Sequence, residues 1–245
     1  MAEPWGWLVL MLGAPVGSFM AAYADRTCAG RSVLDPSRCN ACGARLAVRD
    51  LVPVISFVAL RGRCRHCDTP LSRWLLWAEI IGLACGIVAV AGAFGALHGA
   101  ASAVFLWLLL GLAYCDVRCF RLPDALTLCL VLTGAVLTWD DPARVMSDGA
   151  LGAVAGGGVL LALRVGYRRV RGHDGLGLGD VKLAAGLGLA LGGPALPWVG
   201  LIAAVSALAA AAMGLFGPLR RTTRMPFGAF LALAGALVWG WQVFG

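Results

Sequence analysis

The sequence predicts an all-α polytopic membrane protein with about eight transmembrane helices, and three observations lead to this fold class. Of its 245 residues, 60% are hydrophobic and only 13% are charged, whereas a soluble domain carries about 25% charged residues. The apolar residues gather in long runs, and the mean hydropathy is +0.83. The basic residues fall on one side when successive runs are placed alternately across a membrane, as the positive-inside rule requires.

The apolar runs divide into eight segments. The first follows Glu3 and precedes Arg26, the reverse of the charge order in a secretory signal peptide, so we expect an uncleaved helix. The sixth has 11 residues and rises only about 16 Å, against a membrane core of about 30 Å. The expected helices cover residues 5–24, 74–97, 99–115, 125–139, 149–165, 181–191, 198–216 and 226–243.

The charge distribution predicts the topology. Alternating segments place the loops 25–73, 116–124, 166–182 and 217–225 on one face, and these loops with their flanks hold 19 of the 20 Lys and Arg residues. Only Arg144 falls on the other face. We therefore expect the basic face to be cytoplasmic and both termini to lie outside. The net charge of +7 needs no nucleic-acid partner, and the lipid bilayer is the expected one.

The long loop 25–73 contains two C-x-x-C pairs, which are typical of a zinc site. Cys39 and Cys42 form the first pair, and Cys64 and Cys67 form the second. The intervening "LVPVISFVALRGR" is rich in β-branched and aromatic residues, so a small zinc-ribbon-like loop with strands is expected. The alternative is two unrelated cysteine pairs on a surface. The other five cysteines are expected to be free thiols in a reducing compartment.

Several charged side chains near the basic face have structural interpretations. Glu79 could pair with Arg73 at the membrane edge, or could serve a site, because an intramembrane acid is a functional candidate. Asp124 follows a proline and is expected to cap the helix after it. Asp174 is expected to be solvated. Lys182 could reach the interface with its ammonium group or polarise a site.

Asp116 and Asp180 are the strongest catalytic candidates. Asp116 ends a predicted helix, where a carboxylate meets the unfavourable end of the helix dipole, so local structure gives no reason for it. Asp180 closes the glycine-rich "GLGLGD" and could instead cap the short helix that follows. Both acids fall at the cytoplasmic boundary. Two carboxylates brought together there would share one proton and could activate water, which is the chemistry of an aspartic protease.

The motifs resemble those of a known family. "GLGD" at Gly177–Asp180 resembles the G-x-G-D motif of intramembrane-type aspartic proteases. "YCDVRCFRLPDALTL" is similar to the other aspartate motif of the bacterial type IV prepilin peptidases. "GSF" at 17–19, the cysteine pairs, residues 48–67 and "MPFGAF" at 225–230 follow in the family's order. The chain departs from the family pattern at Ala21, where an Asn is usual, and at Ala229, where a proline is usual.

The resemblance implies that Asp116 and Asp180 are catalytic. It implies cleavage of the leader of type IV prepilins or type II secretion pseudopilins at the cytoplasmic face of the bacterial inner membrane. Members with the cysteine loop commonly also N-methylate the new N-terminus with S-adenosylmethionine, and the residues that would hold this cofactor stay unassigned. The expected organisation is a first transmembrane helix (1–24), a cysteine-rich, zinc-binding methyltransferase region (25–73) and a membrane-embedded peptidase domain (74–245).

Two other function classes fit parts of the sequence. One is a non-catalytic zinc-ribbon membrane scaffold of a pilus or secretion system, for which the two aspartates would be dispensable. The other is a small transporter or proton relay, which would need acids near mid-helix, where only Glu79 is plausible. The glycines before Asp180 favour the peptidase, because they let irregular backbone pack closely and bring an acid to the membrane boundary.

Overall fold

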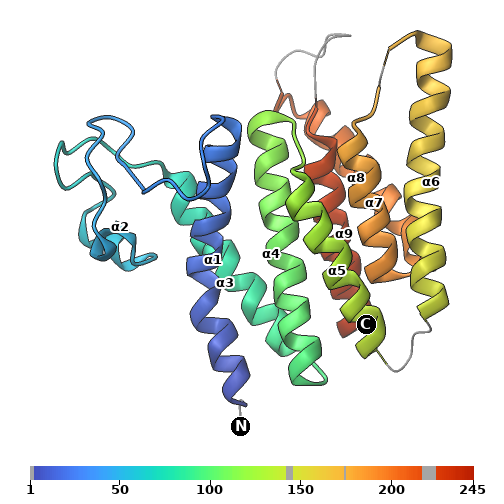
Figure 1. Cartoon of the computed structure of the whole chain (residues 1–245), viewed down its shortest axis with the longest axis horizontal. Helices are drawn as coiled ribbons and strands as arrows, with labels where there is room; N and C mark the ends of the chain where they lie inside the picture. Colours follow the sequence, from blue (N-terminus) through green and yellow to red (C-terminus); the bar gives the residue numbers. More distant parts are fainter. Residues whose placement is uncertain (1–2, 142–145, 174, 217–224) are drawn as a thin grey trace.

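The protein is an all-α bundle in a computed structural model that describes residues 3–141, 146–173, 175–216 and 225–245 (Figure 1). No strand forms within these ranges, which confirms the predicted fold class. In chain order the elements are α1 (Pro4–Cys28), η1 (Val48–Leu51), α2 (Ile55–Ala59), α3 (Arg73–Ala91), α4 (Ala96–Cys119), α5 (Asp124–Asp140), α6 (Met146–Arg171), α7 (Leu178–Leu191), η2 (Gly193–Ala195), α8 (Leu196–Ala212) and α9 (Phe227–Phe244).

All eight predicted segments form helices, but they are not equal in length. In the part of the chain that the structure describes, six helices are long and apolar enough to cross a membrane: α1, α3, α4, α6, η2 with α8, and α9. The other two, α5 with 17 residues and α7 with 14, are shorter. Because α7 packs against α5, α6 and α9, it is enclosed by other helices, and a short helix is tolerated at membrane depth.

The helix ends differ from the predicted ones where polar residues continue a helix. The break predicted near residue 98 lies at 92–95, and α4 runs on to Cys119 before Phe120 ends it in a left-handed conformation (φ 54°). Asp116 therefore lies inside the last turn of α4, and the prediction that it ends the helix is wrong. Likewise α6 continues to Arg171, with three arginines in its last turn. Hydropathy marks where the membrane core ends, while cations at a helix C-terminus allow the helix to extend beyond it.

Helix α4 lies at the centre of the bundle. Figure 1 shows α1 and α3 on one side of it and α5, α7 and α9 on the other. Two thirds of its span is buried, against 17% for the peripheral α6. Glycines permit the closest helix contacts: a Cβ at Gly17 would overlap Ala78 backbone atoms across the α1–α3 contact, and one at Gly188 would overlap Gly152 across the α6–α7 contact.

The linker between the cysteine pairs is helical, so the prediction of strands there is wrong. It forms η1 and α2, and the described loop has only two isolated bridges, Arg38 with Arg45 and Arg63 with Pro70. Backbone hydrogen bonds run locally, from the Val58 N–H to the Val54 carbonyl and from the Leu60 N–H to the Ser56 carbonyl. No neighbouring strand is available as a partner in the described loop, so the helix is what satisfies these polar groups.

The ends of α1 and α4 are joined covalently. Cys28 and Cys119 form a disulfide with a Cα–Cα distance of 5.6 Å, so the prediction of free thiols is wrong for this pair. One turn away, Arg118 pairs with Asp25 at 2.7 Å. The last turns of two helices far apart in the sequence lie side by side, which hydropathy does not reveal.

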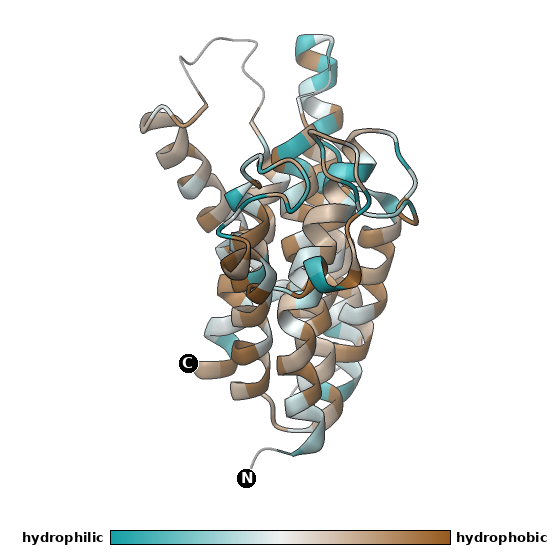
Figure 2. Ribbon diagram, turned by 90° about the vertical axis from the view of Figure 1, so that its left-hand side faces the viewer, coloured by the Kyte–Doolittle hydropathy of each residue, from teal (hydrophilic) through white to brown (hydrophobic). Residues whose placement is uncertain are grey.

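The polar segments gather at one end of the bundle. Figure 2 shows hydrophilic residues concentrated there, and the N- and C-termini at the opposite end. The predicted loops thus share one face where the structure describes them. Arg144, Asp174 and the basic segment 220–224 lie outside the described residues.

Candidate active site

Asp116 is positioned by the junction of α4 with α9. Its side chain is 6% exposed, and its Oδ2 atom accepts a hydrogen bond of 2.9 Å from the backbone N–H of Ala229. Ala229 lies in the first turn of α9, where its N–H bonds locally only to the carbonyl of the N-cap residue Pro226, at 3.2 Å. A helix N-terminus therefore holds this carboxylate, which explains an acid that the end of its own helix would disfavour.

Asp180 is positioned by the start of α7. The helix is capped by Gly177, and Asp180, three residues on, accepts a hydrogen bond of 3.2 Å from the Gly177 N–H through its Oδ2 atom. The prediction that Asp180 could itself be the N-cap residue is wrong, because it makes the reciprocal half of a capping contact. Its other oxygen is left to face the interior, where the side chain is 8% exposed.

The two carboxylates lie on either side of Gly228 at the start of α9. A Cβ placed on Gly228 would be 2.9 Å from Asp180 Oδ1 and 3.0 Å from Asp116 Oδ2. Both oxygens are thus within 3.0 Å of one point, which puts them less than about 6 Å apart. The structure therefore brings together the two acids that the sequence singled out, at the end of the bundle where the polar loops lie.

The glycine-rich segment makes the approach of Asp180 possible. A Cβ on Gly179 would be 2.7 Å from the Cβ of Leu122, in the connection between α4 and α5. Arg164 of α6 donates a hydrogen bond to the carbonyl of Leu176, which holds the segment on its other side. A larger residue at position 179 would push α7 and its carboxylate away from α4.

The arrangement is suited to activating water. Neither Asp116 nor Asp180 forms an ion pair with a described lysine or arginine. Two nearby carboxylates without a neutralising cation cannot easily both carry a charge in a buried site, so a pair in this arrangement can share a proton. One oxygen can then accept a proton from water while the other donates one to a carbonyl oxygen.

Lys182 and Asp124 interact with each other. The Lys182 Nζ atom lies 2.6 Å from Asp124 Oδ1, and both side chains are largely exposed. Asp124 is the first residue of α5 and makes no capping hydrogen bond, so its predicted capping role is wrong. An exposed ion pair of this kind contributes about 0–1 kcal/mol to stability. It holds the Lys182 ammonium group at Asp124 rather than at Asp116 or Asp180.

Glu79 anchors the cysteine loop. The side chain is 5% exposed, and it accepts hydrogen bonds from Ser18 Oγ at 2.9 Å and from the Val54 N–H at 2.7 Å. It does not pair with Arg73, so that prediction is wrong. The contact with Val54 joins α1, α3 and the loop between them at a single buried carboxylate.

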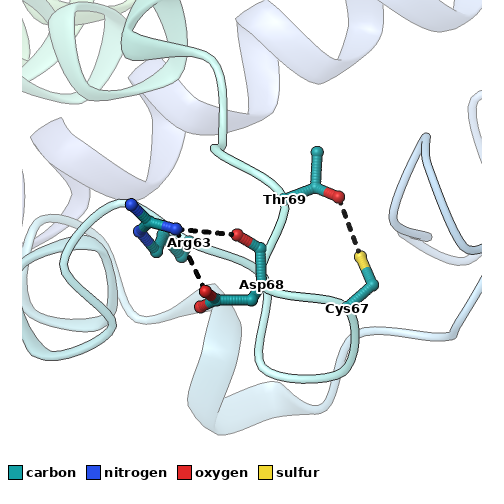
Figure 3. Close-up of polar contacts among 4 residues, drawn as sticks. All are labelled: Arg63, Cys67, Asp68 and Thr69. Atoms are coloured by element: carbon teal, nitrogen blue, oxygen red, sulfur yellow. Dashed lines mark hydrogen bonds and ion pairs between the residues drawn. The ribbon is translucent and has the colours of Figure 1, made fainter.

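The four predicted metal ligands form a compact cluster. The sulfur atoms of Cys39, Cys42, Cys64 and Cys67 all lie within 4.8 Å of one another, and Cys39 Sγ is 3.8 Å from Cys67 Sγ. Tetrahedral zinc with Zn–S bonds of about 2.3 Å requires sulfur separations of about 3.8 Å, so the cluster fits the ion. Hydrogen bonds between Cys67 and Thr69 lower the pKa of Cys67 to about 6, which favours the thiolate that binds metal (Figure 3).

We expect the Cys39→Ser and Cys64→Ser variants to lose bound zinc. Both cysteines are buried members of the cluster, and a hydroxyl is a poor substitute for a thiolate ligand. Metal analysis of the purified protein should fall from about one zinc per chain to nearly none. Cys129→Ser is the matched control, since Cys129 is exposed in α5 and outside the cluster. Zinc at full occupancy in both cluster variants would contradict the assignment.

Two residues of the site have side chains that gave no reason to predict a function. Gly228 and Ala229 appear in the sequence only within the block "MPFGAF". Neither carries a functional side chain, since one contributes space and the other a backbone N–H. A glycine directly after a predicted helix start was the only local signal for a close approach.

Comparisons with known proteins identify the family of the chain. Residues 11–93 match the model of the bacterial peptidase A24 N-terminal domain, and residues 103–217 match that of the type IV leader peptidase family. A prepilin leader peptidase/N-methyltransferase of Burkholderia pseudomallei is 39% identical over 230 residues, which covers 91% of this chain and 71% of that protein. A protein of the same name from Aeromonas hydrophila is 37% identical, with 83% of this chain and 71% of that protein covered. No solved structure matches. The chain belongs to the type IV leader peptidase family.

Proposed function

We propose that the protein is a prepilin leader peptidase that cleaves with Asp116 and Asp180. The observation that carries the proposal is the pair of buried carboxylate oxygens held within 3.0 Å of one point beside Gly228. In the proposed reaction the pair holds one proton. One carboxylate takes a proton from water as its oxygen attacks the scissile carbonyl, and the other donates its proton to the carbonyl oxygen. The proton belongs to the pair rather than to one residue.

The position of the pair suits a substrate that is itself anchored in a membrane. The hydrophobic segment of a type IV prepilin or type II secretion pseudopilin would lie in the bilayer beside the bundle. Its basic leader would project from the polar end, which places the scissile bond at the depth of Asp116 and Asp180. No acyl-enzyme is required, because water attacks directly.

We place the polar end in the cytoplasm and the protein in the bacterial inner membrane. The excess of arginine in the loop 25–73 supports this orientation.

A second activity, N-methylation of the new N-terminus, is supported by a cavity of about 650 Å³ between the cysteine loop and the ends of α1, α3 and α4. Sites for small molecules usually occupy about 300–1,000 Å³. Arg31 and Asp35 line this cavity, and neither side chain is paired with another described residue. Their opposite charges are therefore available to bind the carboxylate and the ammonium group at the amino-acid end of S-adenosylmethionine. The cofactor would supply an electrophilic methyl group.

The cavity and the carboxylate pair share helix α4. Arg118 lines the cavity and follows Asp116 by two residues in α4, which turns it about 200° around the helix axis. The two centres therefore lie on opposite sides of the same helical turn. A newly formed N-terminus would pass over the end of α4 to reach the cavity, which makes methylation a step after cleavage.

One experiment tests both activities. The purified full-length protein is incubated with a prepilin and S-adenosylmethionine, and mass spectrometry measures leader loss and methyl gain separately. We expect both mass changes in the wild type. The Arg31→Gln and Asp35→Asn variants should retain cleavage and lose methylation, whereas Arg49→Gln, in the same loop but outside the cavity, should retain both. An intact leader in the wild type would contradict the peptidase proposal, and equal methylation in all variants would contradict the cavity assignment.

A further inference from the structure

The segment Val48–Leu60 of the cysteine loop, which contains η1 and α2, presents apolar side chains that no described residue covers. The exposed fractions are 69% for Ile55, 66% for Val58 and 45% for Leu51. In a loop surrounded by water this would be an unusual density of exposed aliphatic residues. Phe57, in contrast, packs inward against Gly62, so the segment has an inner and an outer face.

The contacts of Glu79 set the depth of this segment. Val54 donates its N–H to Glu79, and Glu79 also accepts a hydrogen bond from Ser18. Glu79 lies six residues into α3 from Arg73, and Ser18 lies seven residues before Asp25 in α1. At 1.5 Å per residue, Val54 lies about 9–10 Å below the charged ends of these two spans. Figure 1 shows the result, with α2 beside the shafts of α1 and α3 rather than above their ends.

We infer that the segment Val48–Leu60 lies in the headgroup and upper acyl region of the same membrane and anchors the cysteine loop to the bilayer. A depth of about 5–10 Å is that of interfacial helices, which place an apolar face toward the acyl chains. The local helical hydrogen bonds fit this location, because backbone polar groups cannot rely on water there.

Charge supports lipid as the occupant of this surface. Arg49 precedes the apolar residues, and Arg61 follows them. Long arginine side chains reach from such a depth to the phosphates of anionic lipids. A second protein would have to displace lipid from a surface already at membrane depth, whereas the bilayer covers it without any further association.

The backbone of Val54 is strained, which indicates that positioning this segment costs conformational energy. Val54 is β-branched yet has a φ of 61°, a positive value that such residues rarely adopt. The hydrogen bond from its N–H to the buried carboxylate of Glu79 offsets this strain. Glu79 is therefore a positioning residue for the loop, and its proposed role does not depend on the peptidase chemistry.

The test uses the full-length protein in nanodiscs of phosphatidylethanolamine and phosphatidylglycerol. The photo-crosslinker p-benzoylphenylalanine replaces Ile55 or Val58, and Leu34 serves as the control position. Leu34 is 94% exposed in the same loop, but the adjacent Val33 carbonyl accepts a hydrogen bond from Arg26, near the end of α1. We expect lipid adducts by mass spectrometry at positions 55 and 58 and none at 34.

Other outcomes would overturn the inference. Equal lipid adducts at positions 34 and 55 would mean that depth plays no part, and crosslinks from 55 and 58 to a second copy of the chain would identify a protein interface instead. Addition of Glu79→Ala to the protein labelled at position 55 should abolish its lipid adducts. Leader cleavage by each labelled protein reports that it is inserted and folded, and Ser18→Ala, which removes one of the two hydrogen bonds to Glu79, should reduce the adducts in part.

Discussion

We expect the Asp116→Asn and Asp180→Asn variants to lose leader cleavage. An amide has nearly the shape of the carboxylate but can neither accept a proton from water nor share one. General acid–base catalysis contributes about 10²–10⁴-fold to a rate, so the loss of either member should lower the cleavage rate by about 10³-fold or more. Because the two carboxylates act as one unit, the double variant should be scarcely worse than either single one. Cleavage is measured on a prepilin with the purified variants.

The control for this experiment is another acid at the same end of the bundle. Asp124→Asn removes a carboxylate whose ion-pair partner among the described residues is Lys182, so cleavage by this variant should stay within about twofold of the wild type. Each variant is checked for membrane insertion and for bound zinc. Full cleavage by either catalytic-pair variant would contradict the two-aspartate mechanism and favour a non-catalytic scaffold, for which both acids are dispensable.

We expect Gly228→Ala to be nearly as damaging, although it changes no functional group. The added methyl would lie 2.9 Å from Asp180 Oδ1, 3.0 Å from Asp116 Oδ2 and 2.9 Å from Leu122 Cδ1. Contacts this short force the first turn of α9 or the two carboxylates to move. A displacement of about 1 Å at a reacting centre can cost about 10²-fold in rate, and we expect a loss of that order.

The same helix provides a matched control. Gly240 of α9 has no atom near the position of an added Cβ, so Gly240→Ala should cleave like the wild type. The thermal stability of both variants separates a local effect from unfolding, because overpacking typically costs only about 1–3 kcal/mol. If Gly228→Ala cleaves at the rate of Gly240→Ala, the space between the two carboxylates is not required for cleavage.

Several features followed from composition and spacing. The all-α membrane class was predicted from long apolar runs, which a soluble domain does not require. The cysteine quartet was predicted from two C-x-x-C pairs. These properties are carried by neighbouring residues or by regular repeats, so one sequence suffices to recognise them. The two candidate acids were also recognisable, Asp180 by its glycines and Asp116 by a location that local structure did not explain.

Other features depend on residues that are distant in sequence. Glu79 bonds to Ser18 and Val54, and Asp124 pairs with Lys182, whereas local rules predicted an arginine partner for the first and a capping role for the second. The linker between the cysteine pairs has strand-like composition but is helical, because β-propensity is realised only where a partner strand exists.

The active site combines both kinds of information. The motifs could identify Asp116 and Asp180 as acids of interest, because glycine content and helix position are local. In the structure, Gly228 leaves the space between them, and the Ala229 N–H binds Asp116. Ala229 lies 113 residues from Asp116 in the chain and contributes only backbone, so it has no side-chain signature. The space at Gly228 and the Ala229 N–H become part of a site only when α4, α7 and α9 pack together, because this packing sets the distances between the groups.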